Sequence, residues 1–549
     1  MKRIILPFLL LLLVGAASAQ QSEKKHFRIT KNLSVFNSIL RELDANYVDT
    51  LNYDDLVQTG INSMLQKLDP YTVYLPEEMT DDIKMMTTGE YAGIGAIITQ
   101  DGDKVVISEP YEGLPAQKND LRAGDIILEV DGKSATGKTS SDVSAMLKGT
   151  NGTPIIIKIQ RPGEKKPIVK QFLRENIQLN PVAYSAIVAD KTGYLQLNDF
   201  TDKAASEVKT TVTEMVKKNQ ITSLIIDVRD NGGGLVDEAA KIIGFFVPKG
   251  TEVVVMKGKN NQMNRTIKTP SEPIFPNLKL AMLVNRSSAS ASEILAGAFQ
   301  DLDRAVVVGE RTFGKGLVQN IRPVGYGGHV KVTTAKYYIP SGRCIQVLDY
   351  SHRNEDGSVG RVPDSLTTEF LTKNGRKVRD GGGIVPDSIS TDSRKLNIAY
   401  YIFAQNHFFN YATQYVQTHP TIDTPDKFKL KDEDFKAFTN YLINEKKFKY
   451  TTQTEKYYNQ LLEMADYEGL DKVAESEFAA LKAKLIPDVE KNLEANRKDI
   501  EEMLSLEILK RYYFQKGQVQ YSLRNDKDLK IAIELLKNTE KYNKILSVK

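Results

Sequence analysis

The fold is decided by the stretch Ser223-Leu-Ile-Ile-Asp-Val-Arg-Asp-Asn-Gly-Gly-Gly234, in which an apolar strand leads directly into a glycine-rich loop. Two later strands do the same: Leu280–Val284 leads into Asn285–Glu293, and Ala305–Val308 leads into Gly309–Gly316. Helical patterns separate these strands, which is the alternation typical of an α/β sheet. If the strands are parallel, all three loops lie at the carboxyl edge of one sheet, where ligand crevices form.

The regions on either side of this core differ in pattern. Residues 20–88 carry apolar side chains at helical spacing. Residues 89–178 are short β-rich runs punctuated by glycines, and residues 395–549 are helical and charged. The polar, glycine-rich segment 347–383 is predicted to be a long loop inside the core, 179–394. A chain of 549 residues is long enough for several domains of ~150 residues each.

The first residues predict export. Met1-Lys2-Arg3 is basic, residues 4–14 are apolar, and Ala17-Ser18-Ala19 is a small-residue cleavage site, which together make a secretory signal peptide over residues 1–19. The apolar run is shorter than the ~20 residues that a membrane span needs, so membrane association is not required. The signal peptide predicts export. Because the chain has a single cysteine, Cys344, the compartment that we expect is the periplasm or cell envelope.

Composition excludes several function classes. Hydrophobic residues make up 41% and charged residues 26%, the balance of a soluble globular protein. The net charge is +4 with no long Lys/Arg block, so nucleic-acid binding is not expected. A single cysteine and the absence of an HExxH sequence give no metal motif, and no metal or other cofactor is expected.

One literal motif points elsewhere. Gly132-Lys-Ser-Ala-Thr-Gly-Lys-Thr139 fits the phosphate-binding pattern GxxxxGK[ST], and Ser223–Asp227 could serve as its magnesium strand. However, the helix after Thr139 ends by Gly149, which is too short for such a site. The strand-rich unit around it is also too small for the required sheet. We interpret the motif as a lysine-rich turn and keep a nucleotide enzyme as the third hypothesis.

The three strand-end loops supply the parts of a serine hydrolase. A serine at the start of a helix has an exposed hydroxyl, and the next backbone N–H points out of the helix terminus. A glycine run lets a second backbone N–H approach a substrate carbonyl, because no Cβ intervenes. Two such donors form an oxyanion hole, worth about 2.7–4 kcal/mol per donor.

The serine needs a base, and histidine does not supply it in these loops. The five histidines, which all lie elsewhere in the sequence, are His26, His329, His352, His407 and His419. Lys315 lies in the third loop between two glycines, and burial there would lower its pKa toward neutrality. Gln319 lies on the same face if the segment is extended, and its amide could orient the amine without charging it.

These residues resemble a known family. Ser288–Ile294 followed by Thr312–Gln319 is similar to the carboxyl-terminal processing peptidases (peptidase family S41, tail-specific proteases), which use a Ser/Lys dyad. The resemblance implies that Ser290 is the nucleophile, that Lys315 is the base, and that Gln319 positions it.

The glycine loop also matches the family. Asp227–Gly234 resembles its oxyanion segment, with Gly232 where the family often has proline. Either Gly233 or Gly234 would then donate beside Ala291.

Outer motifs extend the resemblance over roughly residues 35–390. They are Leu68–Leu75, Tyr338–Gln346 and Gly383–Asp387. The implied fold is an α/β protease core of the ClpP/crotonase-like type in a multidomain (α+β) chain, with N-terminal helices, an inserted PDZ domain and a C-terminal helical domain.

The PDZ assignment of residues 89–178 has support of its own. Gly93-Ile-Gly-Ala96 is a glycine-bearing loop before a strand, and Ile94, Gly95 and their neighbours could hold a peptide carboxylate on backbone N–H groups. The peptide would then add to the sheet as an extra strand.

The sequence therefore predicts an exported serine endopeptidase that binds and cleaves proteins with exposed C-termini. The alternative is a non-catalytic periplasmic scaffold that binds protein tails, in which Ser290 only caps a helix. The helical regions are candidates for contacts in a homo-oligomer.

Overall fold

The computed structural model describes residues 24, 26–79, 85, 88–354, 358–390, 396–485 and 488–547. It divides into one unit of residues 1–75 with 321–332, and a second of residues 76–320 with 333–549. The predicted signal peptide, residues 1–19, lies outside the described residues. Within the described part, no helix combines the length and the apolar character needed to cross a bilayer.

The first unit is mainly helical. A helix over residues 26–46 precedes α2 (Tyr53–Gln66), which begins where the Asn52 side chain accepts a hydrogen bond from the Asp55 N–H. Strand β1 (Val73–Leu75) pairs antiparallel with residues 329–331. The N-terminal helical prediction is thus matched by two helices in this stretch.

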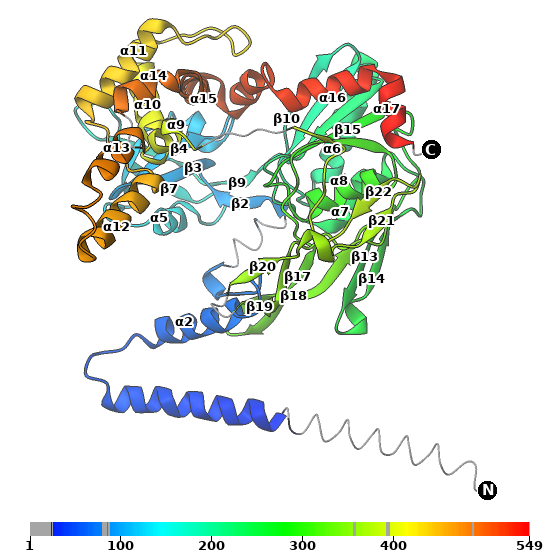
Figure 1. Ribbon diagram of the computed structural model, residues 1–549, viewed down its shortest axis with the longest axis horizontal. Helices are drawn as coiled ribbons and strands as arrows, with labels where there is room; N and C mark the ends of the chain where they lie inside the picture. The colour runs from blue at the N-terminus through cyan, green and yellow to red at the C-terminus, as the bar shows by residue number, and fades with distance from the viewer. Residues whose placement is uncertain are drawn as a thin grey trace. The chain divides into compact units, whose positions relative to one another are not determined.

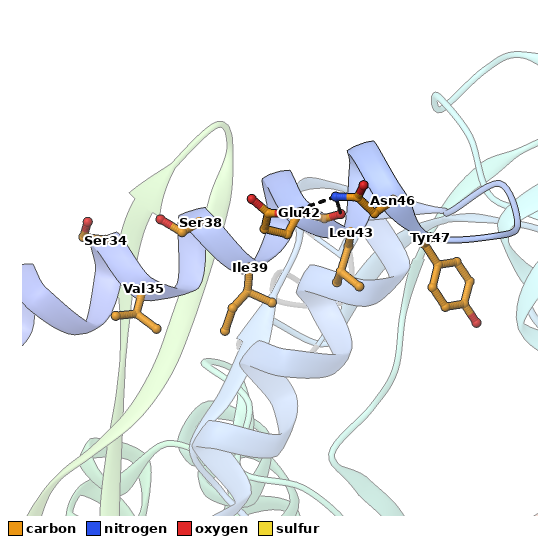
Figure 2. A pocket seen from close by; sticks show the side chains of 8 residues that line it. All are labelled: Ser34, Val35, Ser38, Ile39, Glu42, Leu43, Asn46 and Tyr47. Atoms are coloured by element: carbon orange, nitrogen blue, oxygen red, sulfur yellow. Dashed lines mark hydrogen bonds between the residues drawn. The ribbon is translucent and has the colours of Figure 1, made fainter.

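Figure 2 shows one apolar side of the first helix. Val35, Ile39, Leu43 and Tyr47 project from it at a spacing of four residues and line a pocket. Ile39 is 51% exposed, so this side is largely open to solvent in a single chain.

A six-stranded sheet forms the α/β core, in the order β10-β11-β12-β15-β16-β23. Its strands are β10 (Val182–Ala189), β11 (Thr192–Leu197), β12 (Ser223–Asp227), β15 (Lys279–Val284), β16 (Ala305–Gly309) and β23 (Ser388–Ile389). From β11 to β23 neighbouring strands are parallel, and β10 is an antiparallel edge. The three loops named above therefore do follow the carboxyl ends of neighbouring strands. Every residue of β12 and β16 is buried, as expected for a parallel sheet covered on both faces.

Helices from two distant parts of the chain cover the sheet (Figure 1). One face packs against α6 (Ala204–Asn219), α7 (Val236–Gly244) and α8 (Ala291–Asp301). The other packs against α16 (Lys527–Lys537) and α17 (Thr539–Leu546), the last helices of the chain. The C-terminal helical region thus contributes directly to the hydrophobic core of the α/β domain.

A second sheet is antiparallel, and one of its strands follows the third loop directly in the sequence. In it β13 (Glu252–Gly258) pairs with β14 (Arg265–Lys268) and with β18 (Gly328–Tyr338), which also pairs with β17 (Leu317–Gly325). Because β17 starts two residues after Lys315, it fixes the end of that loop.

The prediction of one long loop over residues 347–383 was wrong. Two short antiparallel pairs occur there, β19 (Leu348–Arg353) with β20 (Val359–Arg361) and β21 (Glu369–Leu371) with β22 (Lys377–Arg379). Three of these strands have only three residues, which is too short for alternation to stand out against the glycine-rich surroundings.

The glycine-punctuated region forms a small β domain. Its main sheet has the order β3-β4-β5-β7-β8, with β6 beside β5. The elements are β2 (Glu90–Gly93), β3 (Ala96–Asp101), β4 (Lys104–Pro110), α4 (Pro115–Lys118), β5 (Ile126–Val130), β6 (Lys133–Ser134), α5 (Ser140–Leu147), β7 (Pro154–Gln160), β8 (Ile168–Leu173) and β9 (Glu175–Gln178). Thr139 caps α5, whose eight residues agree with a turn rather than a phosphate loop.

The remaining helices lie between residues 398 and 523, and most of them share a hydrophobic core. They are α9 (Ile398–Ala404), α10 (His407–Thr418), α11 (Asp432–Asn440), a π-helix (Tyr441–Glu445), α12 (Gln453–Tyr467), α13 (Glu475–Leu485), α14 (Val489–Ala495) and α15 (Arg497–Leu523). Phe435, Phe438 and Leu442, whose spacing predicted an amphipathic helix, are buried in it. Phe514, at φ 54°, interrupts α15 with a kink.

Candidate active site

Ser290 is distinguished from the serines around it by what their hydroxyls do. Ser288 Oγ donates to the Val228 carbonyl at 2.8 Å, and Ser292 Oγ donates to the Asn231 carbonyl at 2.9 Å. Both flanking hydroxyls are therefore buried and tie the start of α8 to the glycine loop. Ser290 is half-buried at the N-cap position of α8. The alternative interpretation of this serine as a helix cap agrees with its position.

The backbone at Ser290 is unusual. Its φ is 56° and its ψ is −114°, a conformation that L-residues rarely adopt and that costs of order 1–3 kcal/mol. Such strain persists only where the surroundings impose it. Here the surroundings are the two flanking serine bonds and the carboxylate of Glu293, which accepts the Ser290 N–H at 2.9 Å.

Glu293 links the loop that carries Ser290 to the loop that carries Lys315. The carboxylate oxygen that accepts the Ser290 N–H also accepts the Lys315 N–H at 2.9 Å. The other oxygen accepts from Thr312 Oγ1 at 2.6 Å and from the Gly314 N–H at 2.7 Å. One side chain thus holds the backbones of Ser290 and Lys315 against the same group.

Burial dominates the electrostatics of Glu293. Its side chain is fully buried, and desolvation raises the pKa of the carboxyl to about 7, although all four hydrogen bonds act to lower it. Sequence reasoning missed this residue. The available signal was an acidic residue three positions after a serine at a helix start, the spacing of a capping box.

Tyr337 makes a second link between the two loops. Its hydroxyl donates to the Lys315 carbonyl at 2.7 Å and lies 3.3 Å from the Ser290 carbonyl. The ring is almost fully buried, so the position of this hydroxyl is fixed by packing.

The glycines on both sides of Lys315 are required by close packing. At Gly314, with φ +87°, a Cβ would lie 1.9 Å from Val347 Cγ2. At Gly316 it would lie 2.8 Å from the backbone nitrogen of Gln346, whose side chain accepts the Gly316 N–H. The Lys315 backbone is therefore held closely on both sides, and its side chain is half-buried.

Gln319 lies on β17, four residues after Lys315. Its amide donates to Thr333 Oγ1 on β18 at 3.1 Å. Among the described residues this is the hydrogen bond that fixes the amide, and its action on the lysine amine stays a prediction.

Gly233 lies against the serine. A Cβ there would lie 2.7 Å from Ser290 Cβ and 2.9 Å from the Ala291 nitrogen, and its φ of +103° favours glycine. The Gly233 N–H donates to Asn231 Oδ1 at 2.8 Å. In the part of the chain that the structure describes, neither the Gly234 N–H nor the Ala291 N–H is engaged in a hydrogen bond. Of the two glycines left open by the sequence, Gly234 is therefore the one with an available donor.

The loop predicted to bind peptide connects β2 to β3. The carbonyls of Ile94 and Gly95 accept the N–H groups of Ala116 and Tyr111 at 2.8 and 3.0 Å. Their own N–H groups have no hydrogen-bond partner in the described ranges. Gly95 has φ +71° and packs on Leu114, where a Cβ would come within 2.7 Å.

The rest of the predicted loop lies at the ends of the two strands. Gly93 ends β2, and Ala96 begins β3. Among the described strands β3 pairs with β4 alone, so its other edge can accept an added strand.

Three family models match the chain. Peptidase family S41 matches residues 191–349, a PDZ domain matches residues 106–161, and the C-terminal helical domain of a probable PDZ-protease matches residues 398–536. The matched ranges contain Ser290, Lys315 and the glycine loop.

Two curated proteins are similar over much of the chain. A carboxy-terminal-processing protease of Bartonella bacilliformis is 35% identical over 350 residues, which cover 62% of this chain and 76% of that protein. A probable CtpA-like serine protease of Staphylococcus aureus is 33% identical over 318 residues, covering 57% of this chain and 62% of that protein.

Among solved structures, the photosystem II D1 C-terminal processing protease is 28% identical, with a TM-score of 0.36 over 65% of this chain and 87% of that one. The identity and coverage of the Bartonella protein, together with the S41 and PDZ matches, decide the family. The chain belongs to peptidase family S41, as a serine protease of the carboxy-terminal-processing group that carries a PDZ domain.

Proposed function

We propose that the protein is an exported endopeptidase that binds protein C-termini through its PDZ domain and cleaves them with a dyad of Ser290 and Lys315. The supporting observation is the carboxylate of Glu293, which accepts the backbone N–H of both residues. The flanking hydroxyls of Ser288 and Ser292 are engaged with backbone carbonyls, which leaves Ser290 for chemistry.

The reaction follows from the parts that meet here. Ser290 Oγ attacks the scissile carbonyl while Lys315 Nζ takes its proton, as an activated nucleophile requires. The N–H groups of Ala291 and Gly234 hold the oxyanion. The protonated lysine then gives its proton to the leaving amine. Water attacks the acyl-enzyme with the same amine as base, which regenerates the serine.

Substrate capture is assigned to the loop between β2 and β3. The N–H groups of Ile94 and Gly95 would hold the terminal carboxylate, and the peptide would lie along β3 as an added strand. The substrates are therefore polypeptides with an exposed C-terminus. Export to the periplasm or cell envelope is supported by residues 1–19.

The test is cleavage of an unfolded protein such as casein by three variants. Ser290→Ala and Lys315→Ala should each lower kcat by at least about 10³-fold, because each removes a reacting group. Ser287→Ala is the matched control, since this exposed serine lies in the same cluster. Thermal melting checks that all three fold.

Full cleavage by Ser290→Ala or Lys315→Ala would contradict the dyad. A wild-type protein that binds tail peptides but cleaves nothing would favour the scaffold alternative. Neither outcome depends on the cellular compartment, which is tested separately by sequencing the N-terminus of the protein secreted by its host.

A further inference from the structure

Arg229 connects the glycine loop of residues 228–234, here called the oxyanion loop because it would supply an oxyanion donor, to a helix far along the chain. It follows β12 by two residues and precedes Gly233 by four. Its Nη2 lies 2.6 Å from Asp526 Oδ2, and its Nη1 lies 3.1 Å from Asp528 Oδ2. Both aspartates belong to the start of α16, and Asp528 is 299 residues away from Arg229 in sequence.

A third carboxylate completes the surroundings of this guanidinium. Asp227 binds the Arg229 Nε at 3.0 Å and its Nη2 at 2.6 Å, and it also accepts the Tyr194 hydroxyl at 2.7 Å. Asp227, Asp526 and Asp528 are 2%, 9% and 14% exposed at the side chain, and Arg229 is 20% exposed. The group is thus largely withdrawn from water, where losing one partner of an ion pair is costly.

The oxyanion loop has two anchors. On the serine side, the Asp230 N–H donates to Asn285 Oδ1 at 3.0 Å, and the Ala289 N–H donates to the Asn231 carbonyl at 3.0 Å. On the other side, Arg229 binds α16. The glycines follow this doubly anchored segment directly, so their N–H directions depend on both anchors.

The two aspartates differ in what else they do. Asp526 caps α16, since its Oδ1 accepts the Leu529 N–H at 2.9 Å. Asp528 makes no other side-chain hydrogen bond among the described residues, so its bond to Arg229 is its one visible contribution. Asparagine caps a helix as well as aspartate does, which lets the charge be removed at 526 without losing the cap.

We propose that Asp526 and Asp528 are positioning residues that orient the oxyanion loop through Arg229. The inference rests on the proposed function, because it assigns a role only if Ser290 forms a tetrahedral adduct. These residues lie outside the part of the chain matched by the S41 model, residues 191–349. Part of the catalytic geometry of this protease is therefore set by its C-terminal helices.

A positioning role predicts which kinetic constant the substitutions change. The donors of an oxyanion hole act on charge that develops in the transition state, so misaligned donors lower kcat and leave KM nearly unchanged. Affinity for a peptide boronate should fall by the same factor as kcat, because its tetrahedral adduct on Ser290 places an oxygen where the oxyanion forms.

The experiment uses the full-length protein with Asp528→Asn, and with the double substitution Asp526→Asn and Asp528→Asn. The matched control is Glu534→Gln, which removes an exposed charge from the same helix. Active sites are titrated with a fluorophosphonate, so that kcat refers to folded enzyme only. We expect kcat of the double variant to fall at least about tenfold, less than the 10²–10³ seen when a donor is removed. The kcat of Glu534→Gln should match that of wild type. Asp528→Glu, which keeps the charge, should retain most of the activity that Asp528→Asn loses.

Wild-type kcat in the double variant would overturn the proposal, as would a loss of kcat with unchanged boronate affinity. If the double variant does not fold, Asp528→Asn and its rescue by Asp528→Glu decide the question. The proposed function itself is tested with a different variant. Cleavage by Ser290→Ala would reject the dyad, whatever the activity of the aspartate variants.

Discussion

At the scale of single residues, the geometry of the site depends on side chains that hold its backbone segments in place. Glu293 has four donors around one carboxylate, and two of them are the N–H groups of Ser290 and Lys315. Any change to this carboxylate therefore alters the surroundings of both Ser290 and Lys315.

The first residue-scale prediction concerns adjacent glycines. Gly233→Ala should abolish cleavage, because its Cβ would lie 2.7 Å from Ser290 Cβ and from the Ala289 carbonyl. Gly232→Ala should retain activity, because nothing lies within 4 Å of a Cβ there. Cleavage of casein by the two purified proteins measures the difference. Equal activity would show that the loop does not press on the serine.

The second concerns pH. The Glu293 carboxyl has a pKa of about 7 in the folded protein and about 4.5 when unfolded. The folded state thus holds a proton that the unfolded state loses, and stability falls as pH rises between these values. Relative to Glu293→Gln, which cannot titrate, wild type should lose about 3 kcal/mol of folding free energy between pH 4.5 and 7.

The measurement is thermal melting of both proteins in a Ser290→Ala background, which prevents self-cleavage. The difference between their midpoints should change with pH in favour of the Gln variant as pH rises. A constant difference across this range would contradict the raised pKa.

Residue identity was predictable where the chemistry is local. Ser290 and Lys315 stood out because their types and neighbours are unusual for strand-end loops. Glu293 did not stand out, because its function depends on donors from a loop some twenty residues away, and sequence spacing does not display such contacts. The role of Arg229 in anchoring the loop was not predictable for the same reason, since its partners Asp526 and Asp528 lie 297 and 299 residues away in the sequence.

At the scale of elements, the strands and helices of the core follow closely from their apolar runs, and parallel pairing brought their loops to one edge as expected. The short strands over residues 348–379 were missed because local pattern is weak there. The placement of α16 and α17 on the sheet was also not predictable, since the apolar face of an amphipathic helix does not indicate which surface it packs against.

This placement gives an element-scale prediction. Ala532 is fully buried where α16 meets the sheet, so Ala532→Asp would bury an unpaired charge and should destabilise the core severely. Lys530→Asp changes an exposed position on the same helix and should stay within about 0.5 kcal/mol of wild type. Denaturant unfolding of the two proteins checks this, and similar midpoints would mean that α16 does not seal the sheet.

At the scale of the whole molecule, the PDZ domain is held by the C-terminal helices. Lys510 on α15 pairs at 3.2 Å with Glu109, whose side chain is 3% exposed. Lys516, beyond the kink at Phe514, pairs at 2.9 Å with the exposed Glu112. The same set of helices therefore contacts the peptide-binding domain and, through α16, the oxyanion loop.

The two lysines should differ in importance. Lys510→Met keeps the side-chain stem but removes the ion pair of the buried Glu109, so it should loosen the PDZ domain and speed hydrogen exchange along β4 and α15. Lys516→Met removes a solvent-exposed pair, which is worth at most about 1 kcal/mol, and should change exchange little. Exchange measured by mass spectrometry separates the two, and equal protection in both variants would contradict a PDZ domain held by Lys510.

Because the chain is synthesised from its N-terminus, α16 and α17 reach the sheet only after all of its strands have been made. The second face of the α/β core stays uncovered until residues 527–546 have left the ribosome, and until then Arg229 has no helix to bind. A polypeptide that stops before residue 527 is therefore expected to be inactive as a protease. Docking of α16 and α17 on the sheet would therefore coincide with the onset of proteolytic activity.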